Sequence, residues 1–217
     1  MAFRSIMTGA NPCYARAMTG LDKQNQQSVA PAPQPWLIRA ERPDDADAVE
    51  ALVDLAFGPG RFAKTAYRLR EGVLPEERLS FVAQDGARDA LLGSVRFWPV
   101  IVGQSPALLL GPLAVVPQLR GRGIGISLMQ HGIRAAAALD YGAVILVGDE
   151  PYYAKVGFAR LTSGQIRFPG PVDPDRVLGL SLNGDSLASM TGDVKRARID
   201  IAASASSAAL GKQKREK

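Results

Sequence analysis

Residues 109–125 read LLGPLAVVPQLRGRGIG, an apolar strand that breaks into a glycine-rich loop and leads directly into a helix. Apolar residues recur at helical spacing after the loop, at Ile126, Met129, Ile133, Ala136 and Ala137. The first turn of such a helix has backbone N–H groups without intrahelical partners, and its dipole leaves partial positive charge there. The stretch therefore predicts an anion site, and phosphate is the natural ligand.

The loop has the residues that a pyrophosphate site requires. Gly121, Gly123 and Gly125 remove Cβ atoms that would keep the ligand from the main chain, and they permit positive φ. Arg120 and Arg122 add positive charge. The dinucleotide-binding fingerprint and the Walker loop are both excluded, because the former needs a third glycine where this chain has isoleucine and the latter needs Gly-Lys-Ser/Thr. A glycine-rich turn that caps the helix without a ligand is the alternative.

Two motifs in the right order carry a family resemblance. Arg120-Gly121-Arg122-Gly123-Ile124-Gly125 resembles motif A of the GCN5-related N-acetyltransferases, Arg/Gln-x-x-Gly-x-Gly/Ala, and Val115-Val116-Pro117 matches the Val-x-Pro signature before it. After an apolar strand predicted at 143–148, Tyr153-Ala154-Lys155-Val156-Gly157-Phe158 resembles motif B, Tyr-x-x-x-Gly-Phe. The wording of the second motif looks most like the YhbS-type branch of that family, and the likeness is dense from Leu110 to Phe158.

The resemblance implies the α/β (α+β) fold of the acyl-coenzyme A N-acyltransferases. That fold has a central twisted mixed sheet, splayed between its fourth and fifth strands, with helices on both faces. The residues themselves predict a matching order: a strand at 36–39, two helical stretches within 44–70, and a hairpin within 79–97. The strand, helix and strand of the two motifs follow, and pairing of 158–161 with 177–182 would close the sheet.

The resemblance further implies acetyl-coenzyme A as the co-substrate, with no metal. Loop N–H groups would hold its pyrophosphate. A bulge near 111–115 would leave main-chain groups of the fourth strand to pair with the pantetheine arm and to donate to the acetyl oxygen, except at Pro112, which has no N–H. The implied cofactor-binding residues are Leu113, Ala114, Val115, Arg120, Gly121, Arg122, Gly123, Ile124, Gly125 and Tyr153.

Tyr153 is the predicted catalytic residue. In the family, the tyrosine at this position lies near the thioester sulfur and can protonate the departing thiolate, and a phenol is neutral at pH 7. A core tyrosine that anchors its helix is equally compatible with the sequence. Many relatives have an asparagine after the fifth strand, where this chain has Asp149-Glu150. These two carboxylates either lie near the cleft or cap the following helix, and no general base is predicted.

The sequence thus predicts an N-acetyltransferase that moves an acetyl group from acetyl-coenzyme A to a primary amine of a small molecule or protein, by direct attack in a ternary complex. The alternative is a module of the same fold that binds acyl-coenzyme A without turnover, as a sensor or a partner-binding subunit. The effect of Tyr153→Phe on a rate separates the two. The acceptor is not identified by any residue pattern, and we expect a monomer or homodimer.

Charge and rare residues exclude other classes of function. The net charge of +5 arises from the ends, because 1–35 carry a net of +2 and 193–217 a net of +4, which leaves −1 between them. We therefore expect no nucleic-acid partner. Cys13 is the only cysteine, so no intrachain disulfide or multi-cysteine metal site can form. His131, the only histidine, is predicted to be a polar position on the long helix rather than a catalytic group.

The composition divides the chain into three parts. Residues 1–35 are predicted to be a disordered extension, although a transit peptide or an overlong start-codon choice would look the same. Residues 36–190 form the predicted acetyltransferase domain, and 191–217 a basic, flexible tail. The longest apolar stretch, 107–116, is interrupted by Gly-Pro and is too short to span a bilayer. We expect no membrane association and a cytoplasmic protein.

Overall fold

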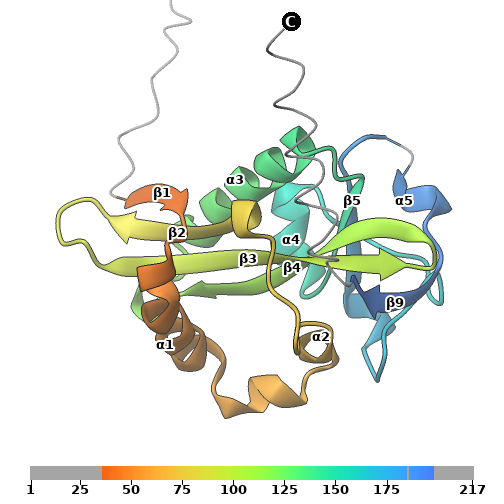
Figure 1. Cartoon of the computed structure of the whole chain (residues 1–217), viewed down its shortest axis with the longest axis horizontal. Helices are drawn as coiled ribbons and strands as arrows, with labels where there is room; N and C mark the ends of the chain where they lie inside the picture. The colour runs from red at the N-terminus through yellow and green to blue at the C-terminus, as the bar shows by residue number, and fades with distance from the viewer. Residues whose placement is uncertain (1–35, 185, 198–217) are drawn as a thin grey trace, which may run out of the picture. The chain divides into compact units, whose positions relative to one another are not determined.

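A computed structural model describes residues 36–184 and 186–197, which form one sheet system with helices on both faces (Figure 1). The predictions for 1–35 and 198–217 lie outside these residues. The strands are β1 (Trp36–Ala40), β2 (Ser80–Asp85), β3 (Leu91–Val102), β4 (Ser105–Val115), β5 (Ala143–Val147), β6 (Ala159–Arg160), β7 (Ile166–Arg167), β8 (Val177–Ser181) and β9 (Gly192–Arg196). The α-helices are α1 (Ala46–Phe57), α2 (Thr65–Arg68), α3 (Ile124–Ala138), α4 (Glu150–Tyr153) and α5 (Ser186–Ser189).

The main path of the sheet runs β1-β2-β3-β4-β5-β8-β6. Along it every pair of neighbours is antiparallel except β4 and β5, which are parallel. Only Leu108 with Val144 and Leu109 with Ile145 are in register between these two strands, so the end of β4 separates from β5. This confirms the predicted mixed sheet and its splay between the fourth and fifth strands.

A bulge in β4 precedes the splay. Val95 and Phe97 of β3 face Leu113 and Leu110 of β4, so two steps along β3 correspond to three along β4. The extra residue falls at Gly111-Pro112, where a proline without an N–H can be accommodated. Trp98 Nε1 donates a hydrogen bond of 2.6 Å to the Gly111 carbonyl, which holds the bulge against β3. The bulge predicted near 111–115 is confirmed.

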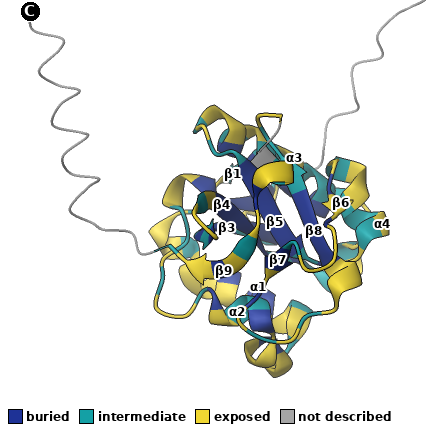
Figure 2. Ribbon diagram, turned by 90° about the vertical axis from the view of Figure 1, so that its right-hand side faces the viewer, coloured by how far each residue is buried: buried dark blue, intermediate teal, exposed yellow. Residues whose placement is uncertain are grey.

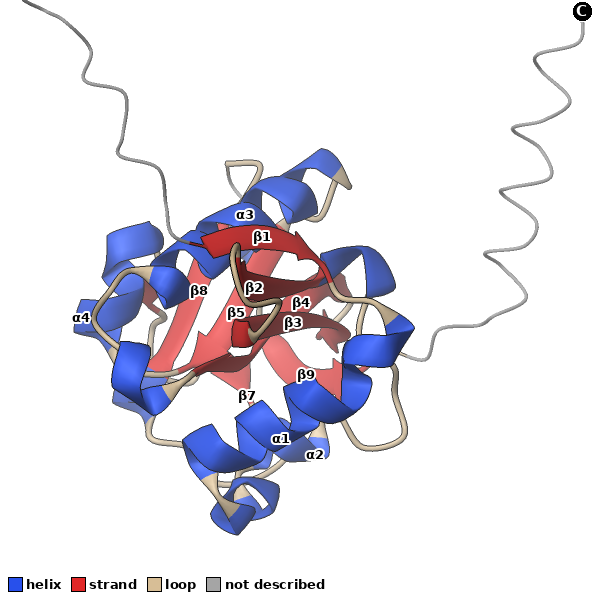
Figure 3. Ribbon diagram, turned by 90° about the vertical axis from the view of Figure 1, so that its left-hand side faces the viewer, coloured by secondary structure: helices blue, strands red, loops and turns tan. Residues whose placement is uncertain are grey.

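The central strands are apolar throughout because both of their faces are covered. Leu108 and Leu110 pack with Leu128 under α3, whereas Leu109 and Ile145 pack on the opposite face. Figure 2 shows β4, β5 and β8 as buried strands, and Figure 3 shows α3 on one side of the sheet with α1 and α2 on the other. Side chains of a strand alternate between its faces, so this continuous apolar run fills two cores.

Two sequence predictions differ from the structure. Two helical stretches were expected within 44–70, but the second is short: α2 covers only Thr65–Arg68 after a 3-10 turn at Pro59–Ala63. The domain was expected to end at 190, but β9 pairs with the far half of β3, which continues to Val102. Val194 is the one buried residue of β9, so the strand shows no apolar pattern and its sequence resembles a charged tail.

Gly132 in the middle of α3 provides a test of the core. A Cβ at this position would lie 2.4 Å from Cε2 of Phe97, which is fully buried. Glycine to alanine in a helix interior ordinarily stabilises by about 1 kcal/mol. We expect the opposite sign for Gly132→Ala, a loss of ~1–3 kcal/mol in the free energy of unfolding, because overpacking displaces the ring.

Urea denaturation measures this change. Gly60→Ala is the control, since Gly60 has open space around its Cβ position and an ordinary φ, and it should change stability by less than about 0.5 kcal/mol. A Gly132→Ala protein more stable than the wild type would contradict the packing of α3 on Phe97.

Candidate functional site

A cleft of about 620 Å³ opens where β4 and β5 separate. The end of β4, the glycine loop, the start of α3 and the segment 149–155 line it, with Ala56 and Phe57 of α1 at one side. Eight of the ten residues predicted to bind the cofactor lie along this cleft: Leu113, Val115, Arg120, Gly121, Gly123, Ile124, Gly125 and Tyr153. The structure therefore brings most of the predicted set together.

The other two predicted residues do not line the cleft. Ala114 is buried in a small core with Val49 and Val53 of α1, because alternation along β4 turns its side chain away from that of its neighbours. Arg122 is exposed, and its backbone N–H donates to the Leu119 carbonyl at 3.4 Å. Their part in binding the cofactor stays a prediction, which for Ala114 rests on the main chain of β4 and not on its side chain.

The helix begins with free donors that face the cleft. Gly123 is the N-cap residue of α3, with φ of 92°, a left-handed conformation that favours glycine. The first backbone hydrogen bond into the helix runs from the Ser127 N–H to the Gly123 carbonyl, at 2.9 Å. The N–H groups of residues 124–126 precede that bond and have no helical acceptor. Together with the helix dipole they form a site for an anion.

The open edge of β4 supplies further donors. Val116 donates its N–H to the Leu92 carbonyl of β3, at 2.9 Å. Successive residues of a strand direct their backbone groups to opposite edges, so the N–H groups of Val115 and Leu113 alternate with this one and face the gap toward β5. Because β4 and β5 have already separated there, these groups are left for water or a ligand.

Two glycines let the tyrosines of α4 approach the cleft. A Cβ at Gly125 would overlap the hydroxyl of Tyr152, and a Cβ at Gly148 would overlap the ring of Tyr153. No motif in the sequence marks Gly148; its position between β5 and a tyrosine-bearing helix was the available clue. The Tyr153 ring also makes an edge contact with Phe158, at 6.0 Å between centroids. Tyr153 thus both packs on the core and lines the cleft.

The environment of Tyr153 favours its neutral form. Burial raises the pKa of Tyr153 to about 12, and Tyr152 and Asp149 act in the same direction. Positive charge on Arg70 and Arg176 lowers the pKa, but by less than burial raises it. The phenol therefore keeps its proton throughout the physiological range.

A second, smaller pocket of about 120 Å³ shares Tyr153, Leu113 and Phe57 with the cleft. We call it the inner pocket. Its other walls come from α1, α2 and the β4 bulge, and its charged lining residues are Arg61, Lys64 and Arg70. No motif in the sequence identifies these three residues, because isolated basic residues in a polar helical stretch have no distinctive spacing. Only the fold brings them to the bulge.

The two carboxylates after β5 are tied to surface arginines. Asp149 lies at the N-cap of α4 and forms an ion pair of 3.1 Å with Arg176, without a side-chain cap hydrogen bond. Glu150 pairs with Arg160 at 2.8 Å. Asp149 lines the cleft but neither residue lines the inner pocket, so neither is placed to accept a proton there.

His131, the remaining titratable candidate, lines neither the cleft nor the inner pocket. The ring of His131 contacts Phe81 at 4.6 Å, and burial with the charge of Arg134 lowers the pKa of His131. Among the described residues no group of three or more His, Cys, Asp or Glu side chains could hold a metal ion. No helix in the same part of the chain is long and apolar enough to cross a membrane.

A sheet splayed beside a glycine-led helix N-terminus defines the class of the acyl-coenzyme A N-acyltransferases, and comparisons with known proteins agree. The family model described as "Acetyltransferase (GNAT) domain" matches residues 76–160. The chain is 33% identical over 162 residues to the uncharacterized N-acetyltransferase YhbS of Escherichia coli, covering 73% of this chain and 95% of YhbS. The chain belongs to the GCN5-related N-acetyltransferase (GNAT) family.

Solved structures give the same result. The crystal structure of Escherichia coli YhbS in complex with coenzyme A has a TM-score of 0.65 and 31% identity, covering 75% of this chain and 90% of that one. A GNAT family acetyltransferase from Brucella melitensis, in complex with acetyl-coenzyme A, has a TM-score of 0.56 and 25% identity, with 75% and 96% of the two chains covered.

The raised pKa of Tyr153 has a measurable consequence for stability. In the unfolded chain the phenol ionises near pH 10, whereas in the folded protein it stays protonated to about pH 12. The contribution of the Tyr153 phenol to the free energy of unfolding is therefore fully present below pH 10 and is lost as the pH rises from 10 to 12. We expect the Tyr153→Phe protein to lose less stability between pH 8 and 10.5 than the wild type, by ~1 kcal/mol. Urea denaturation at both pH values measures this, and equal losses would contradict the burial of the phenol.

Proposed function

We propose that this protein transfers the acetyl group of acetyl-coenzyme A to a primary amine by direct attack within a ternary complex. The observation that carries the proposal is that Tyr153 lines both the cleft and the inner pocket. The cleft offers backbone N–H donors for an anionic carrier, and the inner pocket adjoins α1 and α2. A donor and an acceptor that occupy the two spaces would meet beside one side chain. The ligands of the YhbS and Brucella melitensis structures support the choice of donor.

The cleft fits the carrier on physical grounds. N–H groups of Gly121, Gly123 and residues 124–126 would hold the pyrophosphate, and Arg120 stands at the rim, where its Nη2 donates to the Ala56 carbonyl at 3.3 Å. Acetyl-coenzyme A, when bound, supplies the acetyl group as an activated thioester. The N–H groups of Leu113 and Val115 would pair with the pantetheine arm and donate to the acetyl oxygen. A donor directed at a developing oxyanion contributes about 3 kcal/mol.

Two proton transfers complete the reaction. The Tyr153 phenol, kept neutral by burial, would donate its proton to the departing sulfur. The acceptor amine must be neutral to attack. No carboxylate lines the inner pocket among the described residues, and its charged side chains are all cationic. Positive neighbours lower the pKa of an amine, so the inner pocket would favour the neutral acceptor. The proton that the amine loses after attack would pass to water, since no carboxylate lines this pocket.

Binding of the donor is tested by the thermal midpoint with and without acetyl-coenzyme A. At about a hundred times the dissociation constant the ligand should stabilise the wild type by about 2.7 kcal/mol. Gly123→Asp should abolish the shift, because its carboxylate would repel the pyrophosphate at the helix N-terminus. Gly164→Asp is the matched control: Gly164 also has positive φ and open space but lies outside the cleft, so it should retain the shift. Loss of the shift in both variants would contradict the proposed position of the pyrophosphate.

Catalysis is tested by release of coenzyme A over a panel of primary amines. Tyr153→Phe should lower kcat by about 10²–10⁴-fold and leave the thermal shift with acetyl-coenzyme A in place. For the wild type, kcat should show no fall up to pH 10, since the pKa of Tyr153 is about 12. Binding of acetyl-coenzyme A without release for any amine would favour the non-catalytic module instead.

A further inference from the structure

Arg70 is a charged group of the inner pocket that the proposed reaction leaves without a role. It follows α2 and also lines an adjacent pocket of about 290 Å³. Its Nε is buried and has no hydrogen-bond partner. Its Nη2 lies against the β4 bulge, where a Cβ on Gly111 would be 3.0 Å away. The guanidinium is therefore held at the point where β4 turns from β5, without a protein acceptor for Nε.

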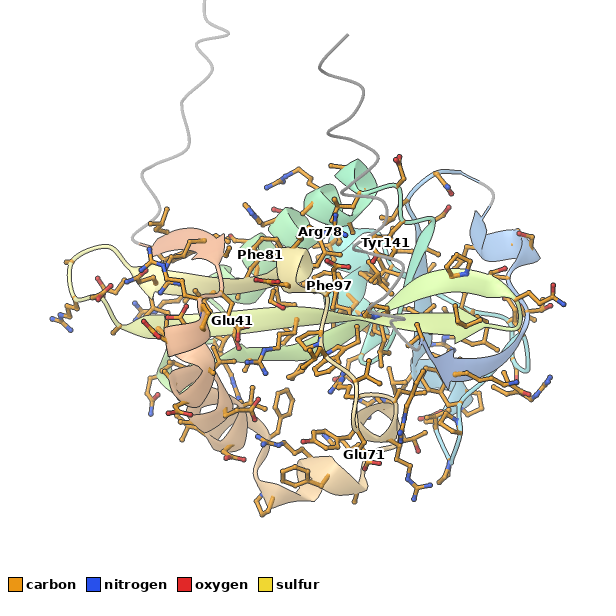
Figure 4. All side chains as sticks on the ribbon, viewed as in Figure 1. Glu41, Glu71, Arg78, Phe81, Phe97 and Tyr141 are labelled. Carbon is orange, nitrogen blue, oxygen red and sulfur yellow. The ribbon has the colours of Figure 1, made fainter. Side chains whose placement is uncertain are left out.

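The neighbouring arginines are paired, and Arg70 is not. Arg61 lies 2.7 Å from Asp54 and 3.1 Å from Glu50. Arg96 binds Glu41 at 2.5 Å and Glu50 at 2.7 Å, and Arg196 binds Glu71 at 3.2 Å. Figure 4 labels Glu41 and Glu71, which lie at well-separated places beside α1 and α2. Within residues 36–184 and 186–197, Arg70 forms no such ion pair, so the acidic side chains here are occupied by other arginines.

An unpaired buried guanidinium is costly to the fold. Burial lowers the pKa of Arg70 to about 10, which reflects the difficulty of charging it there. Replacing such a group by a neutral one costs a folded protein little and can stabilise it. A buried ionisable group that is unfavourable in isolation and lies in a pocket is a candidate for ligand binding.

The chemistry of the group indicates its ligand. A guanidinium presents N–H donors in a planar fork that matches a carboxylate in two parallel hydrogen bonds. A carboxylate satisfies this fork with its two oxygens and is smaller than a phosphate group. The volume of about 120 Å³ admits only a small group.

We propose that Arg70 binds a carboxylate of the acceptor, so that the acceptor is a small amine that also carries a carboxylate, as an amino acid does. This inference rests on the proposed function, because it places the amine of the same molecule beside Tyr153. Arg70 lies close enough to Tyr153 for each to influence the other's ionisation. Both residues line the inner pocket, so a small molecule within it would present its amine to Tyr153 and its carboxylate to Arg70.

Matched acceptors test the proposal through release of coenzyme A. The pairs are glycine and methylamine, alanine and ethylamine, and phenylalanine and phenethylamine. The two members of each pair differ by the carboxylate. For each protein we take the ratio of kcat/KM for the amino acid to kcat/KM for the amine. Comparing this ratio between the wild type and a variant cancels the intrinsic reactivity of the two amines. Arg70→Gln should reduce the ratio for the preferred pair at least tenfold, through a raised KM for the amino acid with little change in kcat.

Two further variants make the result specific. Arg70→Lys keeps the charge without the fork and should recover part of the ratio. Arg68→Gln removes the same charge from α2 at an exposed position outside both pockets and should keep the wild-type ratio. A ratio unchanged in Arg70→Gln, with turnover intact, would overturn the carboxylate site and leave the proposed function standing.

A binding measurement covers the case in which no amine is acetylated. The thermal midpoint is recorded with coenzyme A and either N-acetylglycine or N-acetylphenylalanine, each beside its uncharged amide. We expect a shift with at least one acid, none with its amide, and loss of the shift in Arg70→Gln. That result without turnover would support the carboxylate site and reject the transferase. No shift with either acid would overturn the site.

Discussion

The separation of β4 from β5 is the constraint on which the rest of the site depends. A regular β4 beside a β5 that continued past Val147 would extend the parallel ladder and consume the N–H groups of Leu113 and Val115. The extra residue at Gly111-Pro112 prevents this, because it redirects the strand after only two registered pairs. The chain thereby leaves strand-edge donors unpaired inside a domain, where burying them without any partner would be unfavourable. The cleft keeps them accessible, and the same displacement creates space on the other side of the strand for the inner pocket.

The glycines act through packing as much as through backbone freedom. Gly123 needs its left-handed conformation to start α3, but Gly125 and Gly148 are required by the tyrosines of α4, whose hydroxyl and ring occupy the space of the missing Cβ atoms. The helix N-terminus and Tyr153 are thus held against one opening by contacts between segments about 25 residues apart in the chain. Glycine is therefore needed in this motif for two separate reasons: the left-handed turn at Gly123 that starts the anion-binding helix, and the space above Gly125 that Tyr152 fills.

The sequence predicted those features that a short pattern can specify. The apolar run of β5, the helical period after Gly125 and the two motifs place the sheet, α3 and α4 in order, and the cleft follows from them. The motif did not indicate that the side chain of Ala114 is buried or that Arg122 is exposed, because a motif names positions but not which way their side chains face. Arg70 and β9 were missed for another reason: one buried valine, or one unpaired arginine, acquires meaning only from distant residues that pack around it. Charge pairing among Glu50, Arg61 and Arg96 joins parts of the chain that no local period connects.

The cleft and the inner pocket share Phe57, Leu113 and Tyr153 but differ in their other walls: the start of α3 lines only the cleft, and α2 lines only the inner pocket. If the donor occupies the cleft and the acceptor the inner pocket, each would enter past walls that the other does not touch, and neither would close the other's route. Under the proposed reaction, the kinetic mechanism would then be random: either substrate can arrive first, and either product can leave while the other is still bound. Such a reaction would need no lid to impose the order of binding.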